Sequence, residues 1–298
     1  MDILIIYNPK SGRAKSEEII DKIKKTKFFE NNKIETFELK NHNDHLIFDQ
    51  CQNKTFDIVV AIGGDGTINT SANLILSKLP KAKLMIVPTG SSNTLAMSLN
   101  VPLSWRKKIK KLNNPAGLKD KIIDVGVVDE KNYFLESVIV GYAAQVAGTT
   151  KQPMKNRHGF RAYIFNFFRH PKPDIYKFKL FVDGKSYDIE ASTLGVLNAF
   201  EGFAGIPTRQ KTSNDDGMLD VMFMKYDNFL KFLVSVFYLF LTKASPKKQF
   251  KIFSGQKIVL SKNDNHQKIP LLIDGEPAVF ENNHLTFKVI PRGLNILI

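Results

Sequence analysis

The chain has 298 residues, and its 43 Lys and Arg against 29 Asp and Glu give a formal net charge of +14 over a length that allows two domains. Its 43% hydrophobic and 24% charged residues are typical of a globular protein, which excludes a disordered, collagenous or fibrous chain. The longest apolar run, residues 229–241, is interrupted by Lys231 and is shorter than the ~20 residues of a membrane span, so a transmembrane helix is excluded as well.

The first part of the chain alternates apolar runs, loops and helical patterns. Residues 2–7, 57–62 and 84–87 are predicted strands, and each is followed by a loop rich in Gly, Ser or Asn. Helices are predicted after these loops, for example where Ile19, Ile20 and Ile23 share one face. Because the strands are apolar throughout, we expect them to be buried on both faces, in a parallel sheet covered by helices.

After about residue 121 the pattern changes to short strands and few helices. Predicted strands include residues 133–140, 175–182, 186–194, 219–224 and 285–290, and Asp-Gly turns fall at 183–184, 216–217 and 274–275. The sequence therefore predicts an α/β plus all-β fold: a Rossmann-like parallel sheet with helices, then an antiparallel β-sandwich. Two domains are expected, residues 1–125 and residues 126–290. Residues 291–298 are a candidate further part of the first domain.

A glycine-rich loop, Gly63-Gly64-Asp65-Gly66-Thr67, lies between a predicted buried strand and a helix start. Glycines let backbone N–H groups approach phosphate oxygens, and the helix dipole favours negative charge there. We interpret the loop as a nucleotide phosphate site, with an ordinary tight turn as the alternative. A carboxylate beside phosphates would repel them, so Asp65 is expected to bind a metal ion or to take part in proton transfer.

Two further loops follow predicted strands at equivalent places, residues 8–12 and residues 88–93. Loops at the carboxyl ends of parallel strands line one crevice, where ligands bind. Each loop alone could be no more than a turn with a helix cap. Neither a P-loop nor a Gly-x-Gly-x-x-Gly motif occurs in them, which disfavours a P-loop ATPase and a dinucleotide dehydrogenase.

Five motifs in order give the chain its resemblance to a known family. They are Asn8-Pro-Lys-Ser-Gly12, Gly63-Gly-Asp-Gly-Thr67, Pro88-Thr-Gly-Ser-Ser-Asn93, Asn214-Asp-Asp-Gly-Met-Leu-Asp220 and Asp274-Gly-Glu276. The combination resembles the diacylglycerol kinase catalytic-domain family, in particular the soluble bacterial lipid kinases related to sphingosine kinases. The resemblance implies an amino-terminal nucleotide domain, a β-rich domain that carries the lipid site, and a catalytic cleft between them. It also implies ATP- and magnesium-dependent phosphoryl transfer to a lipid hydroxyl, of diacylglycerol or of a sphingoid-type lipid.

The family's functional residues can be carried over position by position. The resemblance implies Glu276 as proton acceptor, Asp65 as a further catalytic residue and Asp124 as a carboxylate that supports the active-site network. It implies a structural magnesium site at Asp215, Asp220 and the carbonyl of Met218, whose oxygen-only ligands suit this ion. The implied nucleotide contacts are Asn8, Pro9, Lys10, Ser11, Gly12, Thr36, Gly63, Gly64, Asp65, Gly66, Thr67, Ile68, Asn69 and Ser91.

One departure from the family pattern leaves alternatives open. Thr94 follows Asn93 where the bacterial relatives have Asp, as a non-acidic residue does in sphingosine kinases. The alternatives to a lipid kinase are an NAD kinase, disfavoured by the Asp-Asp-Gly and Asp-Gly-Glu elements, and a catalytically inactive relative that binds nucleotide or lipid.

Charge and cysteine content predict the partners and the cellular location of the protein. Residues 137–173 hold no acidic residue and interleave basic with aromatic side chains, which favours contact with anionic lipid headgroups, and residues 229–248 are a second candidate. No nucleic-acid-binding module accompanies them, so nucleic acid is not expected as a partner. A single cysteine, Cys51, and a first segment without signal-peptide features predict a cytoplasmic protein, peripheral on the inner face of the membrane. The oligomeric state is left open, with a homodimer as one option.

Overall fold

The computed structural model divides the chain into two compact units. Unit 1 comprises Met1–Ile123 and Arg292–Ile298, and unit 2 comprises Asp124–Pro291. The structure describes residues 1–9, 16–40, 46–90, 93–99, 101–149, 172–199, 202–203, 206–207, 213–228, 231, 251–263 and 268–298.

Unit 1 is built on a parallel sheet. Its strands are β1 (Asp2–Tyr7), β2 (Lys33–Glu38), β3 (Ile58–Gly63), β4 (Lys83–Pro88) and the last part of β18 (His284–Leu297), in the order β2-β1-β3-β4-β18. The chain leaves β1 toward β2 and then returns to place β3 on the other side of β1. The sheet therefore reverses its direction of winding between β1 and β3, and such a switch point is where open α/β sheets bind ligands.

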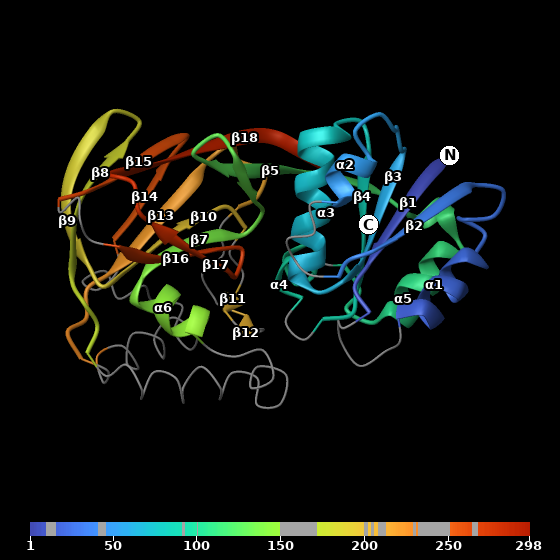
Figure 1. Cartoon of the computed structure of the whole chain (residues 1–298), viewed down its shortest axis with the longest axis horizontal. Coiled ribbons are helices and arrows are strands. Elements are labelled where there is room, and N and C mark those ends of the chain that lie inside the picture. The colour runs from blue at the N-terminus through green and yellow to red at the C-terminus, as the bar shows by residue number, and fades with distance from the viewer. Residues whose placement is uncertain are drawn as a thin grey trace. The chain divides into compact units, whose positions relative to one another are not determined.

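Helices cover both faces of this sheet (Figure 1). α1 (Ser16–Lys24) and α5 (Trp105–Leu112) share one hydrophobic cluster with alternate strand residues such as Ile3 and Ile5, while α3 (Asp65–Lys78) packs on β3 and β4. Every residue of β3 is buried, as its continuous apolar sequence predicts. The shorter helices are α2 (Leu46–Gln50), α4 (Thr94–Ser98) and the 3₁₀ turn η1 (Pro115–Gly117).

The end of β18 is fastened to unit 1 by hydrogen bonds outside the sheet ladder. Lys119 and Ile298 exchange two backbone hydrogen bonds, both 2.9 Å long. The ammonium group of Lys108, a fully buried residue of α5, donates to the carbonyl oxygen of Leu297 at 3.3 Å. Residues 292–298 are therefore an integral part of unit 1, although more than 160 residues of unit 2 precede them in the chain.

Unit 2 contains two sheets. One is antiparallel and six-stranded, in the order β14-β13-β10-β7-β16-β17. Its strands are β7 (Ser137–Gly141), β10 (Thr193–Leu197), β13 (Leu219–Met224), β14 (Lys251–Gly255), β16 (Ile269–Ile273) and β17 (Glu276–Phe280). In the other sheet the first part of β18 pairs with β15, β15 pairs with β8, and β8 pairs with β9. Its members are β5 (Asp120–Val128), β6 (Asn132–Phe134), β8 (Tyr176–Val182), β9 (Lys185–Ala191) and β15 (Lys257–Lys262). The remaining elements are α6 (Tyr142–Thr149) and the short pair β11 (Gly202–Phe203) and β12 (Ile206–Pro207).

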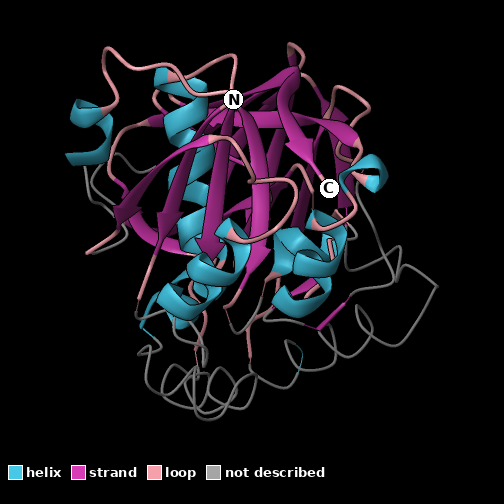
Figure 2. Ribbon diagram, turned by 90° about the vertical axis from the view of Figure 1, so that its right-hand side faces the viewer, coloured by secondary structure: helices cyan, strands magenta, loops and turns pink. Residues whose placement is uncertain are grey.

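One hydrophobic cluster joins the two sheets of unit 2. It includes Phe178 and Leu180 of β8 together with Val140 of β7 and Val196 of β10, which is the packing of a β-sandwich. Strands accordingly predominate over helices in Figure 2. The predicted fold class, a parallel α/β sheet followed by an antiparallel β-sandwich, is confirmed.

Two predicted strands are each divided in the structure. Residues 133–140 form the end of β6 and most of β7, separated at Leu135 and Glu136, and residues 186–194 are divided at Ser192 between β9 and β10. The predicted Asp-Gly turns at 183–184 and 274–275 connect β8 to β9 and β16 to β17, with positive φ at all four residues as two-residue hairpins require. Within the described residues no helix has the length and hydropathy needed to cross a membrane.

Candidate active site

The loops that follow β1, β3 and β4 are joined by backbone hydrogen bonds. The N–H of Asn8 donates to the carbonyl of Ile62 at 3.3 Å, and the N–H of Thr89 donates to the carbonyl of Gly63 at 2.8 Å. Ser16, the first residue of α1, donates its hydroxyl to the carbonyl of Asn8 at 2.9 Å. The structure thus brings the starts of the three predicted loops together at the carboxyl edge of the sheet.

Glycine is required where two of these loops touch. A Cβ on Gly90 would lie 2.5 Å from the Cα of Gly64 and 2.9 Å from Oδ1 of Asn93, and both distances are shorter than real contacts allow. A Cβ on Gly63 would lie 2.2 Å from Oγ1 of Thr67. The two loops are therefore in backbone-to-backbone contact, and no larger residue fits at the contact.

Asn93 closes the loop that follows β4. Its side chain accepts a hydrogen bond from the N–H of Gly90 at 3.0 Å and donates one to the carbonyl of Gly90 at 2.8 Å. Its backbone is left-handed, with φ 51°, a conformation that Asn tolerates better than other non-glycine residues. Asn93 was part of the sequence motif, but only the structure assigns it this positioning role.

The first turn of α3 faces the same edge. Its N-cap is Gly64, and no side chain of the described residues caps it, so its first backbone N–H groups keep the partial positive charge of a helix start. The hydroxyl oxygen of Thr67 is buried here without a hydrogen-bond partner in the described part of the chain. The carboxylate of Asp65 belongs to the same turn. These groups can bind an anion, and phosphate is the anion that helix N-termini beside glycine loops commonly take.

The other predicted nucleotide contacts differ in exposure and in their position on the sheet. Pro9 is exposed next to Asn8, and Gly66 and Asn69 are partly buried in α3, where Asn69 accepts a hydrogen bond from Asn73 at 3.0 Å. The side chain of Ile68 is completely buried. Thr36 is exposed within edge strand β2, opposite Ile5. Lys10, Ser11, Gly12 and Ser91 lie outside the described residues.

In unit 2, the buried carboxylate of Asp124 holds the loop that contains the acidic motif. Its Oδ2 accepts a hydrogen bond from the N–H of Gly217 at 2.6 Å, and its own N–H donates to the carbonyl of Asn214 at 2.7 Å. Gly217 has φ +71°, which favours glycine. Asp124 is therefore a residue that positions the loop of the acidic motif.

Asn198 connects Asp124 to a second segment. Its side-chain amide donates two hydrogen bonds, to the carbonyls of Asp124 and Leu135, each 2.9 Å long, and its backbone N–H donates to the carbonyl of Glu136 at 2.8 Å. The residue is completely buried. Only an amide has two donors in this geometry, so neither Asp nor Leu could replace it without loss.

Asp274 holds the same segment from the other side. Its carboxylate accepts hydrogen bonds from three consecutive backbone N–H groups, those of Leu135 at 2.7 Å and of Glu136 and Ser137 at 2.9 Å. Asp274 and Gly275 form the turn that leads into Glu276, the first residue of β17, which is partly buried and pairs with Ile273. A hydrogen-bonded chain thus runs from Glu276's hairpin through Asp274 and Asn198 to Asp124.

The acidic motif itself is crowded with negative charge. Burial raises the pKa of Asp216, and the charges of Asp220 and Asp124 raise it further, against a lowering by the N–H of Met218. Oδ1 of Asp215 accepts a hydrogen bond from the hydroxyl of Ser213 at 2.5 Å, and Asp220 accepts one from Ser254. Among the described residues, no group of three or more His, Cys, Asp or Glu side chains is arranged to hold a metal ion. The predicted magnesium ligands include only two such side chains, those of Asp215 and Asp220, together with the carbonyl of Met218. The absence of a group of three therefore does not bear on this predicted site.

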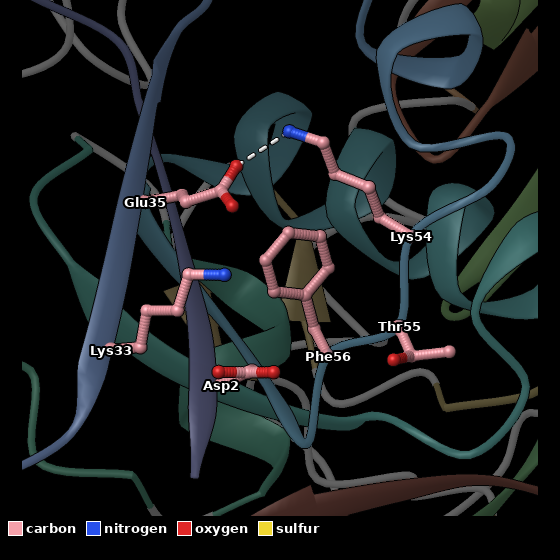
Figure 3. Close-up of a pocket in the computed structure, with 6 residues that line it drawn as sticks. All are labelled: Asp2, Lys33, Glu35, Lys54, Thr55 and Phe56. Carbon is pink, nitrogen blue, oxygen red and sulfur yellow. Dashed lines mark hydrogen bonds and ion pairs between the residues drawn. The ribbon is translucent and has the colours of Figure 1, made fainter.

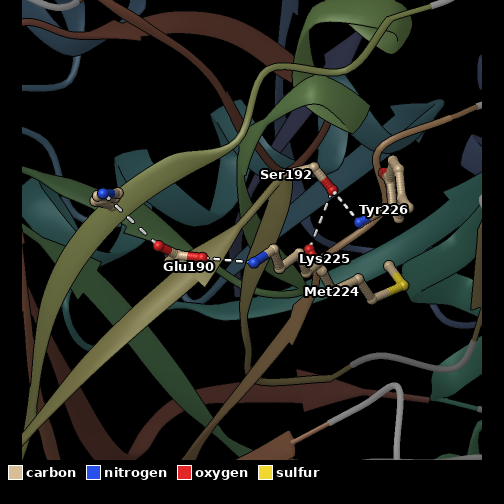
Figure 4. A network of polar contacts seen from close by, with 6 residues as sticks. Glu190, Ser192, Met224, Lys225 and Tyr226 are labelled. Atoms are coloured by element: carbon tan, nitrogen blue, oxygen red, sulfur yellow. Dashed lines mark hydrogen bonds and ion pairs between the residues drawn. The ribbon is translucent and has the colours of Figure 1, made fainter.

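A different polar network lies at the opposite end of β10 and β13 (Figure 4). Ser192 donates to the carbonyl of Met224 and accepts from the N–H of Tyr226, each at 3.1 Å, and Oγ1 of Thr193 lies 2.7 Å from the hydroxyl of Tyr226. Burial raises the pKa of Tyr226. Nearby, Glu190 forms an ion pair with Lys225, whose hydrogen bond lowers the carboxyl's pKa. This network links strands to each other and contains no predicted site residue.

A cavity of about 220 Å³ lies at the amino-terminal edge of the parallel sheet (Figure 3). It is lined by Asp2, Lys33, Glu35, Lys54, Thr55 and Phe56, and Lys54 forms a 2.6 Å ion pair with Glu35 across it. Because Asp2 and Lys33 begin β1 and β2, the cavity is at the end of the strands opposite to the loops. Its charges balance, so it offers no preference for a nucleotide.

Comparison with known proteins bears on this arrangement. Residues 2–125 match the diacylglycerol kinase catalytic domain. The chain is 27% identical over 237 residues to proteins named diacylglycerol kinase from Staphylococcus aureus, which covers 75% of this chain and 70% of theirs. The resemblance inferred from the five motifs is therefore confirmed.

Solved structures agree on the fold. A diacylglycerol kinase from Bacillus anthracis superposes with a TM-score of 0.74 at 19% identity, covering 99% of this chain and 96% of that one. An NAD kinase from Archaeoglobus fulgidus, solved in complex with ATP, gives a TM-score of 0.54 at 14% identity and covers 99% and 93%. The fold is thus shared with both kinds of kinase, and it resembles the diacylglycerol kinase more.

Proposed function

Starting from the diacylglycerol kinase catalytic domain that residues 2–125 form, we propose that this protein transfers the γ-phosphoryl group of ATP to the hydroxyl of a membrane lipid. The supporting observation is the construction of the loop edge in unit 1. There two loops meet glycine to glycine at Gly90 and Gly64, next to a helix start without a side-chain cap and the buried hydroxyl of Thr67. This edge presents hydrogen-bond donors of the backbone to an anion of several charges.

In this proposal the residues of unit 1 bind and orient ATP. The first N–H groups of α3 and the hydroxyl of Thr67 donate to phosphate oxygens, and Asn93 keeps the loop after β4 in place. Phosphoryl transfer depends mainly on positioning and on stabilisation of charge, so a rigid cradle of this kind supplies a large part of the catalysis. Asp65 is close enough to this edge to engage a catalytic metal ion or to relay a proton.

In unit 2, Glu276 is the proposed proton acceptor. A lipid hydroxyl must lose its proton as it attacks the γ-phosphorus, and a partly buried carboxylate held by a fixed hairpin can accept that proton. Asp274 fixes the hairpin through its three backbone hydrogen bonds, and Asn198 extends the constraint to Asp124. Asp274 and Asn198 are thus positioning residues, which act through Glu276 and Asp124.

The acidic motif fits a magnesium ion. Its donors are oxygen atoms, which this hard cation prefers. Burial raises the pKa of Asp216, the charges of Asp220 and Asp124 raise it further, and a bound cation would relieve this repulsion between carboxylates. We propose that Asp215, Asp220 and the carbonyl of Met218 hold a structural magnesium ion. Magnesium that accompanies ATP would neutralise charge on the phosphates during transfer.

Two considerations favour a lipid over NAD as the acceptor. The Staphylococcus aureus relatives are named diacylglycerol kinase, and the bacterial diacylglycerol kinase fold superposes better than that of the NAD kinase. A lipid acceptor also requires access to a membrane, and we propose peripheral binding to the anionic inner face. The two segments predicted to make this contact are residues 137–173 and 229–248, and most of each segment lies outside the described residues.

Transfer of label from ATP distinguishes these functions. The protein is incubated with ATP labelled at the γ-phosphate and with diacylglycerol, a sphingoid base, ceramide or NAD, and the products are separated. The proposal predicts label in a phosphorylated lipid. Label in NADP alone would make the protein an NAD kinase, and ATP binding without any transfer would make it an inactive relative.

A further inference from the structure

Residues 101–119 contain no acidic residue and five basic ones apart from Lys108. Most of them belong to α5, whose sequence Trp-Arg-Lys-Lys-Ile-Lys-Lys-Leu turns its apolar side and Lys108 inward. Arg106, Lys107, Lys110 and Lys111 are exposed. α5 thus presents four positive charges on a short surface helix.

α1 and α5 lie side by side (Figure 1), and the end of α1 and the segment that follows it are basic as well. The N–H of Phe28 donates to the carbonyl of Leu112 at 3.1 Å, and the N–H of Lys27 donates to Oδ1 of Asn113 at 3.4 Å. The segment that follows α1 therefore contacts the end of α5, and Nζ of Lys22, near the end of α1, lies 5.1 Å from the centroid of the Trp105 ring at the start of α5. Exposed cations of α5, of the last residue of α1 and of the segment after α1 form what we call the basic surface: Lys24, Lys25, Lys27, Arg106, Lys107, Lys110 and Lys111.

The charges of the basic surface are not neutralised locally. Within the described residues, none of its seven cations forms an ion pair with a carboxylate. Two acidic residues of α1, Glu17 and Glu18, are in its first turn, and the third, Asp21, lies three positions before Lys24. The guanidinium of Arg106 stacks over the Trp105 ring, 4.3 Å from its centroid. Lys24, Lys110 and Lys111 lie in the last turns of their helices, where cations complement the helix dipole, but the other four cations do not.

A buried lysine lies under the basic surface. Lys108 is buried on the inner side of α5, and burial together with the charge of Lys111 lowers its pKa to about 8. Like charges on one surface also repel each other. An anionic partner would offset that repulsion, so charge complementarity indicates what the surface binds.

Its composition favours a lipid bilayer among anionic partners. Six of its seven cations are lysines, whose flexible stems place point charges among headgroups, whereas fixed bidentate recognition uses arginine. Leu103, immediately before the helix cap Ser104, is an apolar side chain that is 49% exposed. Cations with an exposed apolar residue at the start of a short amphipathic helix are typical of an interfacial contact.

We propose that the basic surface docks unit 1 on an anionic bilayer. The choice of a membrane as partner rests on the proposed lipid-kinase function, but the binding itself needs no catalysis. It is a contact in addition to those predicted from residues 137–173 and 229–248, and it belongs to the nucleotide-binding unit.

The test compares two variants with the same loss of charge. Lys107→Glu with Lys110→Glu alters the basic surface, and Lys78→Glu with Lys81→Glu alters exposed lysines at the end of α3. Sedimentation with phosphatidylcholine vesicles containing about 30 mol % phosphatidylglycerol measures binding at low and physiological salt. We expect the first variant to bind at least about tenfold more weakly and the second less than about twofold. Phosphorylation of a short-chain, water-soluble lipid should be unchanged in both.

Several results would overturn the proposal. Equal losses of vesicle binding in both variants would mean that net charge alone explains the effect. Unchanged vesicle binding in the first variant would mean that the membrane contact lies elsewhere. Weaker binding of the first variant to a DNA oligonucleotide, with vesicle binding unchanged, would assign the surface to nucleic acid. If Lys107→Glu with Lys110→Glu does not fold, Lys110→Gln with Lys111→Gln carries the same test. The protein could also phosphorylate no lipid while the first variant loses vesicle binding as expected. That pair of results would contradict the proposed function but would support the docking surface.

Discussion

The candidate sites of the two units are built from different parts of the chain. In unit 1 the loops are held by backbone hydrogen bonds and by the contact of Gly90 with Gly64, so main-chain atoms form the site. In unit 2 the site depends on side chains, because Asp124, Asn198 and Asp274 satisfy the backbone of neighbouring segments. The difference corresponds to the proposed roles: phosphates are bound by many N–H groups, whereas a proton is transferred by one carboxylate.

The two constructions should fail in different ways. An added methyl group disturbs the glycine contact of unit 1, and it should weaken ATP binding. Removal of a hydrogen-bonding side chain disturbs unit 2, and it should slow turnover at saturating ATP. Measurements of KM for ATP and of kcat therefore distinguish a defect in unit 1 from a defect in unit 2.

The largest effect is expected at Glu276. Glu276→Gln removes the proposed base and should lower kcat by about 10²–10⁴-fold with KM for ATP nearly unchanged, because general-base catalysis contributes that much. Steady-state kinetics on the phosphorylated lipid measure both constants. Glu281→Gln, in the exposed ion pair with Lys268, is the matched control. Wild-type turnover in Glu276→Gln would remove the assigned role.

The next effect concerns the glycine contact. Gly90→Ala places a methyl group 2.5 Å from the Cα of Gly64, and it should raise KM for ATP by about tenfold or more, since overpacking typically costs about 1–3 kcal/mol. Gly117→Ala is the control, because a Cβ there meets nothing within 4 Å. Equal KM values for the two variants would mean that ATP does not bind at this edge.

Asn198 tests the side-chain construction of unit 2. Asn198→Ala leaves the carbonyls of Asp124 and Leu135 without their donor and should lower kcat by about tenfold while it destabilises the fold by about 1–3 kcal/mol. The kinetics are measured well below the melting temperature, with KM for ATP as the internal control. A loss of stability with normal kcat would reduce Asn198 to a structural residue.

The acidic motif should respond to magnesium. In the wild type, magnesium is expected to raise the melting temperature, because binding to the native state stabilises it by mass action. Asp215→Ala with Asp220→Ala should remove this increase. Thermal scans with and without magnesium provide the measurement, and an equal increase in the double variant would show that the ion binds elsewhere.

The smallest effect is expected at the opposite end of the same sheet. Tyr226→Phe removes the hydroxyl that lies 2.7 Å from Thr193 and should cost about 1 kcal/mol of stability without a change in kcat or KM. Chemical denaturation and kinetics on one preparation give both quantities. A kinetic defect here as large as that of Asn198→Ala would contradict the distinction between the two ends.

The sequence was sufficient for the fold class because the decisive signals are local. Continuous apolar runs such as that of β3 predicted buried parallel strands, and the Asp-Gly pairs at 183–184 and 274–275 predicted hairpins that the structure confirms. The division of residues 133–140 into two strands was not predictable. It depends on the carboxylate of Asp274, which binds the N–H groups at the break from more than 130 positions away.

The same limit applies to the candidate site. The glycine loops and the acidic motif were recognisable from their order, and the resemblance they predicted is confirmed. The roles of Asn93 and Asn198 were not predictable, because an asparagine in a loop or at a strand end has no pattern that reveals its partners. Asn198 binds segments 63 and 74 positions away, and only the folded chain brings them together.

The most direct test of the central claim follows the atoms of the transferred group. ATP that carries ¹⁸O on the γ-phosphoryl oxygens is incubated with protein, magnesium and dispersed diacylglycerol, and the lipid product is analysed by mass spectrometry. The account predicts a phospholipid whose non-bridging phosphate oxygens are labelled and whose bridging oxygen comes from the lipid hydroxyl. Labelled inorganic phosphate or labelled NADP in place of that phospholipid would contradict it.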